Sequence, residues 1–503
     1  HKFSFWRKKG VKYIQPEIPF GNTKDIIFLK KTVAEKYKDF YDEYPNEPYV
    51  GLYELSTPSL LIRDPELIRH VMVKDFAHFQ KEGSSTEIKC GAPLNEHLLN
   101  LTGSKWRSLR SKLSPTFTSG KMKLMFNLML ECVDQLKEYL DKYADNEETL
   151  EMKEVMSKFT TEVVGSCAFG LNFNAIKDEN SEFRKMGRKI FEASITAPFK
   201  RFVRITFPFI LKVLRISPIS PELVNFFTGV VKDTIQYREK NNVVRNDFLQ
   251  LLIELKHKGS IEYEDSSEIN KNELYHEEIN GKTKHMEIEF TDNLMASQAF
   301  VFFLAGFETS STTLSFCLHE LACNPDVQDK LRKCIRTTLN KYDGKITYES
   351  LQNMSYLDQV VDETLRKYPA GSTLGRVVTK PYQIPGSSLK LDVGDKVQIS
   401  VYALHHDPKY FPHPERFNPD NFTPEAKAKR PNYTYLPFGD GPRNCIGMRF
   451  GLLQTKLGLA VLISNYEFSV CEKTEIPIRL DPKKIIISFT TGAWMKIKKC
   501  QTV

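Results

Sequence analysis

Residues 438–447 read FGDGPRNCIG and place Cys445 in a glycine-rich loop that leads into an apolar segment. The chain holds nine cysteines, an odd number, and no CxxC pair, which argues against a disulfide framework and a zinc site. The loop lacks the Lys-Ser/Thr pair of a phosphate-binding loop, and no histidine lies nearby to activate a nucleophilic thiol. A thiolate bound to a metal is the remaining option.

The sequence around Cys445 also suggests which metal is bound. A helix starting just after this residue would hold the thiolate charge through its backbone N–H groups, and Arg443 would also lower the pKa of the thiol. No second ligand lies in the local sequence, so the metal must bring most of its own ligands. Heme iron, with four equatorial nitrogens, fits that description.

The composition is that of a large folded chain with a mildly basic balance. It has 503 residues, of which 41% are hydrophobic, and a net charge of +8. This charge suits an anionic membrane surface or an acidic protein partner. Nucleic-acid binding is weakly supported, because the sequence has no stripe of Lys and Arg interleaved with aromatic residues. No run of 18 apolar residues predicts a transmembrane helix. Residues 1–22 are expected to be the linker that follows a removed anchor, with an ordinary terminus as the alternative.

Hydrophobic periodicity predicts a mainly α protein with small β-sheets at its margins. Residues up to about 85 mix strands with a short helix, and 104–260 read as mostly helical. Residues 256–289 are rich in charge and read as an exposed connection. The C-terminal segment 483–499 is expected to form a β hairpin.

One long helix carries a second motif, AGFETSSTT. It is expected to start at Thr291 or the residue after it, to end before Pro325, and to be buried because it is apolar nearly all round. Gly306 in its middle destabilises the helix by about 1 kcal/mol relative to alanine. A glycine there therefore needs an explanation, such as the close approach of a flat ligand. Thr309 can donate to a carbonyl one turn earlier, and Glu308 lies beside it. Together they suit proton transfer in a local widening; a kinked helix with a satisfied threonine is the alternative.

A third motif, DETLRKYP, covers residues 362–369. Glu363 and Arg366 are three residues apart, so they share one helix face, and Pro369 prevents the helix from continuing. On these residues alone the pair reads as a surface ion pair, worth well under about 1 kcal/mol.

Taken together, these motifs resemble the cytochrome P450 family of heme-thiolate monooxygenases. FGDGPRNCIG is similar to the family's FxxGxRxCxG loop, AGFETS to its A/G-G-x-E/D-T stretch and ETLR to its ExxR motif. WRSLR at 106–110 resembles the family's WxxxR helix, and PERF at 414–417 the segment that completes a Glu-Arg-Arg core. The resemblance spans nearly the whole chain and is closest to microsomal members of insect family six and mammalian family three. It implies a long central distal helix and a proximal cysteine loop, within one catalytic domain over 23–503.

The resemblance implies a role for each matching residue. Cys445 would be the axial thiolate ligand of heme b, and Glu308 and Thr309 would guide protons to dioxygen at the heme. The other cofactor-binding residues would be Trp106, Arg110, Ala305, Arg376, Phe438, Arg443 and Gly447. A buried charge network would be formed by Glu363, Arg366 and Arg416. The substrate pocket would draw on Phe302, Ser372, Thr373, Leu374, Phe489 and Thr490.

The implied reaction is monooxygenation, with NADPH electrons delivered by a reductase and cytochrome b5 as a further partner. Lipophilic small molecules, such as xenobiotics, plant toxins, insecticides or endogenous lipids, would be hydroxylated or epoxidised. The expected location is the cytosolic face of the endoplasmic reticulum membrane. Basic residues that suit an acidic reductase face are Lys121, Lys123, Arg443 and Arg449. Residues 198–216 suit either insertion into the membrane surface or packing on the domain.

Two other functions fit parts of the sequence. A heme-thiolate isomerase or dehydratase would need no reductase, but the Glu308–Thr309 pair would then have no oxygen to protonate. A non-catalytic heme or lipophile carrier would bind ligands without consuming NADPH.

Overall fold

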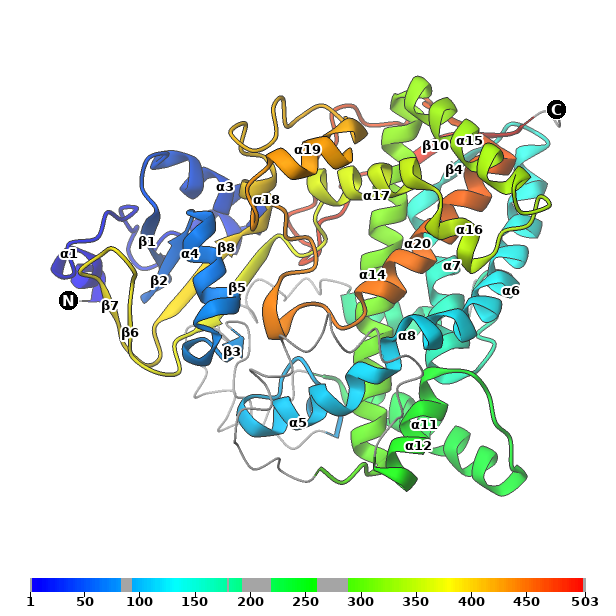
Figure 1. The fold of residues 1–503 in the computed structure, drawn as a ribbon, viewed down its shortest axis with the longest axis horizontal. Coiled ribbons are helices and arrows are strands. Elements are labelled where there is room, and N and C mark those ends of the chain that lie inside the picture. The colour runs from blue at the N-terminus through cyan, green and yellow to red at the C-terminus, as the bar shows by residue number, and fades with distance from the viewer. Residues whose placement is uncertain (1, 83–92, 179–180, 192–218, 260–287, 501–503) are drawn as a thin grey trace.

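Helices form most of the chain in the computed structural model, which describes residues 2–82, 93–178, 181–191, 219–259 and 288–500 (Figure 1). The helices of the first half are α1 (Phe5–Lys8), α2 (Lys24–Ile27), α3 (Val33–Glu43), α4 (Pro65–Arg69), α5 (Gly103–Leu113), α6 (Ser119–Ala144), α7 (Met152–Val164), α8 (Glu182–Phe191), α11 (Pro221–Asn241) and α12 (Phe248–Lys258). Those of the second half are α14 (Asp292–Cys323), α15 (Pro325–Asn340), α16 (Tyr348–Gln352), α17 (Ser355–Lys367), α18 (Val401–His405), α19 (Pro424–Lys429) and α20 (Met448–Asn465).

Three small sheets accompany the helices in the described part of the chain. A five-stranded sheet has the order β1 (Tyr49–Glu54), β2 (Thr57–Ile62), β8 (Lys396–Ser400), β5 (Thr373–Val377), β3 (Lys81–Glu82). Its pairs are antiparallel except β2 with β8, which is parallel. The other sheets are β4 (Thr149–Glu151), β10 (Trp494–Lys499), β9 (Tyr466–Ser469), and β6 (Tyr382–Gln383) with β7 (Lys390–Leu391). The mainly α fold with small sheets is therefore confirmed.

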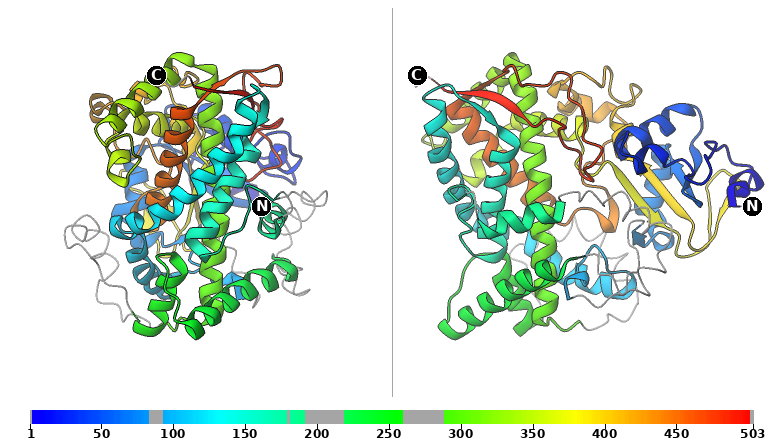
Figure 2. Two further views of the ribbon diagram at one scale, coloured as in Figure 1. Left: turned by 90° about the vertical axis from the view of Figure 1, so that its right-hand side faces the viewer. Right: turned by 180° about the vertical axis from the view of Figure 1, so that it is seen from behind.

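The apolar side chains gather in two clusters. The larger one fills the space among the long helices, and the smaller one lies between the five-stranded sheet and the helices α3, α4 and α18. Helix α14 runs through the middle of the helical part, with α7 alongside it, and α6 packs on α7 and α20 (Figures 1 and 2). The cysteine loop lies where the two parts meet, ahead of α20.

Helix α14 has the bounds that its sequence predicts. The Thr291 hydroxyl accepts a hydrogen bond from the Leu294 N–H at the start, and Pro325 opens the next helix. Within the described residues it is the one helix long and apolar enough to cross a membrane, but 67% of its most apolar stretch is buried inside the molecule. Its apolar character is therefore that of a core helix.

The N-terminal segment packs on the five-stranded sheet. The Trp6 ring is 1% exposed, and its Nε1–H donates to the Leu52 carbonyl at 2.9 Å. Gly51 lies directly under that ring, where a Cβ would come within 2.5 Å of it. Residues 2–22 are thus part of the folded unit, although a linker was predicted there.

The predicted C-terminal hairpin is wrong. Strand β10 pairs on one side with β4 and on the other with β9, so neither of its edges is left for residues 483–491. Within that segment, Phe489 makes an isolated bridge to Leu480. The expected membrane segment 198–216 and most of the expected connection 256–289 lie outside the described residues, and α12 runs to Lys258.

Candidate heme and substrate site

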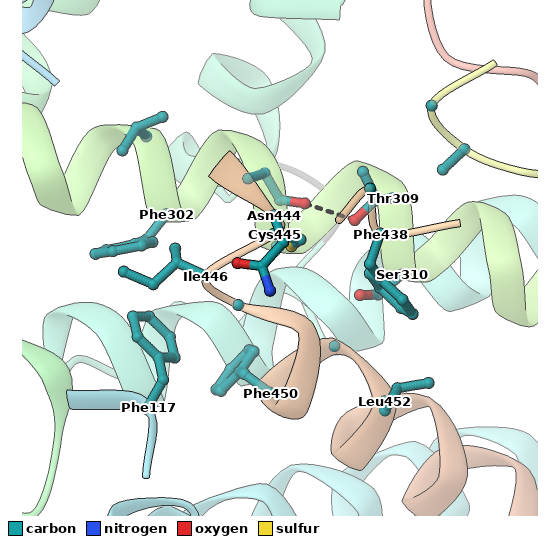
Figure 3. A pocket seen from close by; sticks show the side chains of 18 of the residues that line it. Phe117, Phe302, Thr309, Ser310, Phe438, Asn444, Cys445, Ile446, Phe450 and Leu452 are labelled. Atoms are coloured by element: carbon teal, nitrogen blue, oxygen red, sulfur yellow. Dashed lines mark hydrogen bonds between the residues drawn. The ribbon is translucent and has the colours of Figure 1, made fainter. Parts of the chain in front are cut away.

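A cavity of about 340 Å³ separates helix α14 from the Cys445 loop. Figure 3 shows Cys445 between α14, which carries Phe302 and Thr309, and the start of α20, which carries Phe450. Most of the lining is apolar and aromatic. The predicted site residues that line it are Trp106, Arg110, Phe302, Ala305, Thr309, Leu374, Phe438, Arg443, Cys445 and Gly447.

Hydrogen bonds of its loop fix the position of Cys445. Its N–H donates to the Phe438 carbonyl at 2.9 Å, and α20 begins three residues later. The loop comes close to the neighbouring chain at Gly441, which has φ +72° and where a Cβ would lie 1.9 Å from the Met72 carbonyl oxygen. Glycine is required there because any side chain would push the loop away from the chain at Met72.

The Cys445 thiol opens onto the cavity but is enclosed by protein. Burial raises its pKa, while the Gly447 N–H and the charge of Arg110 act in the opposite direction. The prediction that Arg443 lowers this pKa is wrong, because Arg110 is the cation that does so. Burial leaves the free thiol neutral, and a bound metal ion would supply the positive charge that a thiolate needs.

Three arginines from different parts of the chain, Arg110, Arg376 and Arg443, are buried beside the cavity. Burial lowers the pKa of Arg110 and of Arg443 to about 10, and it also lowers the pKa of Arg376. Among the described residues, Glu82 is the one carboxylate within 4.0 Å of any of them, at 3.7 Å from Arg443 Nη1. The site therefore carries an excess of buried positive charge.

The contacts of these arginines leave room for anionic partners. Arg110 donates to the Asn444 side-chain oxygen at 2.6 Å, and Arg376 has no partner for its buried Nε–H. Arg443 lies 4.2 Å from the centre of the Trp106 ring and donates to two backbone carbonyls.

These features fit heme. Its two propionates would neutralise the arginines, and Cys445 would supply one ligand while the porphyrin supplied four. No group of three or more His, Cys, Asp or Glu side chains in the described ranges could hold a metal ion.

The middle of α14 faces the cavity at Ala305, Gly306 and Thr309. The Thr309 hydroxyl donates to the Ala305 carbonyl at 2.6 Å, as its sequence position predicts. Glu308 points elsewhere and pairs with Lys153 on α7, with 3.0 Å between Oε1 and Nζ. The structure gives a further reason for Gly306, since a Cβ there would lie 3.0 Å from the Val164 side chain.

The Glu363–Arg366 pair is a buried bidentate ion pair, not a surface one. Both side chains are fully buried, and two hydrogen bonds of 2.8 Å join them. The prediction for the Arg416 side chain is wrong, because Arg416 is exposed and only its backbone carbonyl accepts from Arg366, at 3.2 Å. Instead, the Asn418 N–H and the Asn421 side chain donate to Glu363.

Four predicted pocket residues lie outside the cavity. Strand β5 alternates its faces, so Leu374 reaches the cavity while Thr373 does not, and the carbonyl of the buried Ser372 accepts the Tyr402 N–H. Phe489 stacks on Phe316 of α14 with ring centres 4.1 Å apart. Thr490 beside it is exposed and donates to the Arg479 carbonyl.

Several cavity residues were not predicted from the sequence. Phe248 reaches the cavity from α12, and Phe117 reaches it from the segment before α6. No local pattern predicts this. Ile446 and Phe450 had a signal, because they lie on either side of the helix start that directly follows Cys445.

The comparisons with known proteins agree with this geometry. The profile of the family Cytochrome P450 matches residues 15–493. Cytochrome P450 6k1 of Blattella germanica is 40% identical over 491 residues, which cover 98% of this chain and 92% of that protein. Cytochrome P450 6a2 of Drosophila melanogaster is 40% identical over 504 residues, covering 99% and 96%. The chain therefore belongs to the cytochrome P450 family and is a heme-thiolate monooxygenase that binds heme b.

Proposed function

We propose that the protein hydroxylates or epoxidises lipophilic small molecules, such as xenobiotics, plant toxins, insecticides or endogenous lipids. The cavity above Cys445 carries this proposal. Its lining is mostly apolar, with aromatic rings from Phe117, Phe248 and Phe302. The Thr309 hydroxyl lies one turn from Ala305, and Ser310, Thr313 and Thr455 are the other hydroxyl residues of the lining. Such a lining favours apolar substrates and leaves few polar groups to orient them.

Within this proposal, Cys445 is the axial ligand and the buried arginines hold the propionates. Bound heme supplies the activation of dioxygen, which the side chains alone cannot perform. The apolar walls exclude water from the substrate side, and Trp106 supports Arg443 from below its guanidinium plane. Ala305 and Gly447 have little or no side-chain bulk, and all three of Ala305, Phe438 and Gly447 line the cavity.

Thr309 and Glu308 are proposed to move protons. The Thr309 hydroxyl lines the cavity and can turn from the Ala305 carbonyl to donate into it. Glu308 lies behind it, within the ion pair to Lys153, and would reload that hydroxyl after a change of side-chain rotamer.

The electrons are proposed to come from NADPH through a reductase on the cytosolic face of the endoplasmic reticulum membrane, with cytochrome b5 as a second donor. Lys121, Lys123 and Arg449 support docking of an acidic partner on the side of the Cys445 loop. Arg443 does not, because its side chain is only 3% exposed. We also propose that the protein associates with the membrane surface.

The test is the reduced, carbon monoxide-bound spectrum of the wild type and of Cys445→His. Thiolate ligation predicts a long-wavelength Soret band in the wild type and its loss in the variant. NADPH consumption with a reductase and an alkoxycoumarin probe then separates a monooxygenase from a carrier or an isomerase. A carrier would bind the probe without consuming NADPH, and the proposal would then be wrong.

A further inference from the structure

His405 is the last residue of α18 and is completely buried between the ion-pair helix α17 and the chain that leads to Cys445. Its Nδ1 lies 3.2 Å from the Arg366 carbonyl, and its Nε2 lies 2.9 Å from the Leu436 N–H. Because a carbonyl can only accept and an N–H can only donate, Nδ1 carries the proton and Nε2 accepts. Both ring nitrogens of this neutral imidazole are therefore used.

One end of His405 is fixed by the buried ion pair. Arg366 Nη1 donates to the His405 carbonyl at 3.0 Å, while the His405 ring donates back to the Arg366 carbonyl. Arg366 is itself held by Glu363 through two hydrogen bonds. Two reciprocal contacts thus tie His405 to Arg366, whose side chain is fully buried in its pair with Glu363.

The other end reaches the cysteine loop. The Leu436 N–H that His405 accepts belongs to a segment whose carbonyls hold the loop: Leu436 accepts the Gly439 N–H at 3.1 Å, and Phe438 accepts the Cys445 N–H at 2.9 Å. The Tyr435 ring stacks on the imidazole with centres 5.1 Å apart. The position of the imidazole therefore sets that of the chain carrying the Phe438 carbonyl.

We infer that His405 is a positioning residue for Cys445, since its imidazole couples the Glu363–Arg366 pair to the segment that orients the ligand loop. The inference rests on the proposed role of Cys445 as heme ligand. Loss of the Nε2 contact would release the Leu436 N–H and let the loop move, whereas loss of the Nδ1 contact alone would disturb the loop less, because the His405 carbonyl still accepts from Arg366.

The two contacts can be separated by substitution. A glutamine amide reaches the position of Nε2, so His405→Gln can still accept from the Leu436 N–H. An asparagine amide reaches only the position of Nδ1, so His405→Asn can donate to the Arg366 carbonyl but leaves the Leu436 N–H without a partner. The adjacent His406 is a matched control. It is also buried, but its Nδ1 bonds to the Tyr402 carbonyl of its own helix.

The experiment follows the reduced, carbon monoxide-bound spectrum over time, together with heme content and urea unfolding. We expect His405→Asn to lose the long-wavelength Soret band at least tenfold faster than His405→Gln, while His406→Asn and His406→Gln behave alike. Hydrogen exchange of the Leu436 amide in the heme-free chain should rise in His405→Asn only. If His405→Asn and His405→Gln lose the band equally fast, or in proportion to their unfolding midpoints, the inference is overturned. A wild-type band that survives Cys445→His would instead overturn the ligand assignment.

Discussion

The Glu308 carboxylate lies 3.0 Å from the ammonium group of Lys153, 155 positions earlier in the chain. The same ammonium donates to the Ser311 and Thr312 hydroxyls, at 2.7 and 3.1 Å. Burial lowers the pKa of Lys153, and the carboxylate beside it acts in the opposite direction. Thr309, the next residue after Glu308, lines the cavity. The acid and the alcohol of the motif therefore face different environments.

Removing the ammonium should destabilise the protein. Lys153→Met leaves the Glu308 carboxylate nearly buried without its cation, and we expect a loss of about 3 kcal/mol in the free energy of unfolding. The double variant with Glu308→Gln should recover most of that loss, because no unpaired charge remains. Urea unfolding of the four proteins measures the coupling. A Lys153→Met protein as stable as the wild type would show that the pair contributes nothing.

The Thr309 hydroxyl should control the fate of dioxygen. Thr309→Ala removes the hydroxyl that bonds to the Ala305 carbonyl, and product formed per NADPH should fall by up to about a hundredfold, the low end of what a positioned proton donor contributes. Peroxide release should rise to match. Thr309→Ser keeps the hydroxyl and serves as the control. Peroxide and product are measured in the same reductase assay, and equal yields in all three proteins would remove Thr309 from the proton path.

Local patterns predicted the loop around Cys445 and the extent of α14, whereas most of the other site residues were expected from the family resemblance. The loop around Cys445 and the caps of α14 are short-range features, and the structure has them where the sequence places them. The direction of the Glu308 side chain could not be predicted, because its partner lies on another helix. Phe489 is a similar case, since its stacking on Phe316 depends on packing between distant segments.

The Arg416 prediction failed for a related reason. A segment that resembles a motif places the backbone near Arg366, but the turn geometry decides whether the carbonyl or the side chain points inward. The Arg416 carbonyl does so, with the side chain exposed. Sequence spacing alone cannot predict whether the carbonyl or the side chain of Arg416 points inward.

The contrast between the buried Glu363 side chain and the exposed Arg416 side chain provides a matched pair of variants. Glu363→Gln removes the carboxylate from a fully buried ion pair and should cost about 3–5 kcal/mol of unfolding free energy, with loss of heme during purification. Arg416→Ala shortens an exposed side chain and should change stability by less than about 0.5 kcal/mol. Urea unfolding and heme content per chain test both. Equal losses in the two variants would mean that the Arg416 side chain does belong to the network.

Substitution of a buried arginine should stabilise the heme-free chain but weaken its hold on heme. Arg376→Met removes a buried cation whose Nε–H has no partner, so the heme-free chain should become more stable by about 1–3 kcal/mol. The same change should speed the transfer of heme to apomyoglobin, because a propionate loses its partner. Urea unfolding of the heme-free chain and the transfer rate are measured separately. If the stability of the heme-free chain and the heme transfer rate both fall or both stay constant, Arg376 does not bind a heme propionate.

Buried histidines should make the protein sensitive to acid. Burial lowers the pKa of His97 to about 4 and that of His406 to about 3, whereas both titrate near 6.5 in the unfolded chain. Between pH 6.5 and 4 the unfolded state therefore binds protons that the native state does not, so stability is full above pH 6.5 and falls with decreasing pH. Each histidine contributes up to about 1.4 kcal/mol per pH unit in this window. His97→Gln should flatten the slope by about that amount in urea unfolding at pH 6.5, 5.5 and 4.5, and an unchanged slope would mean that this imidazole is protonated in the native state as readily as in the unfolded one.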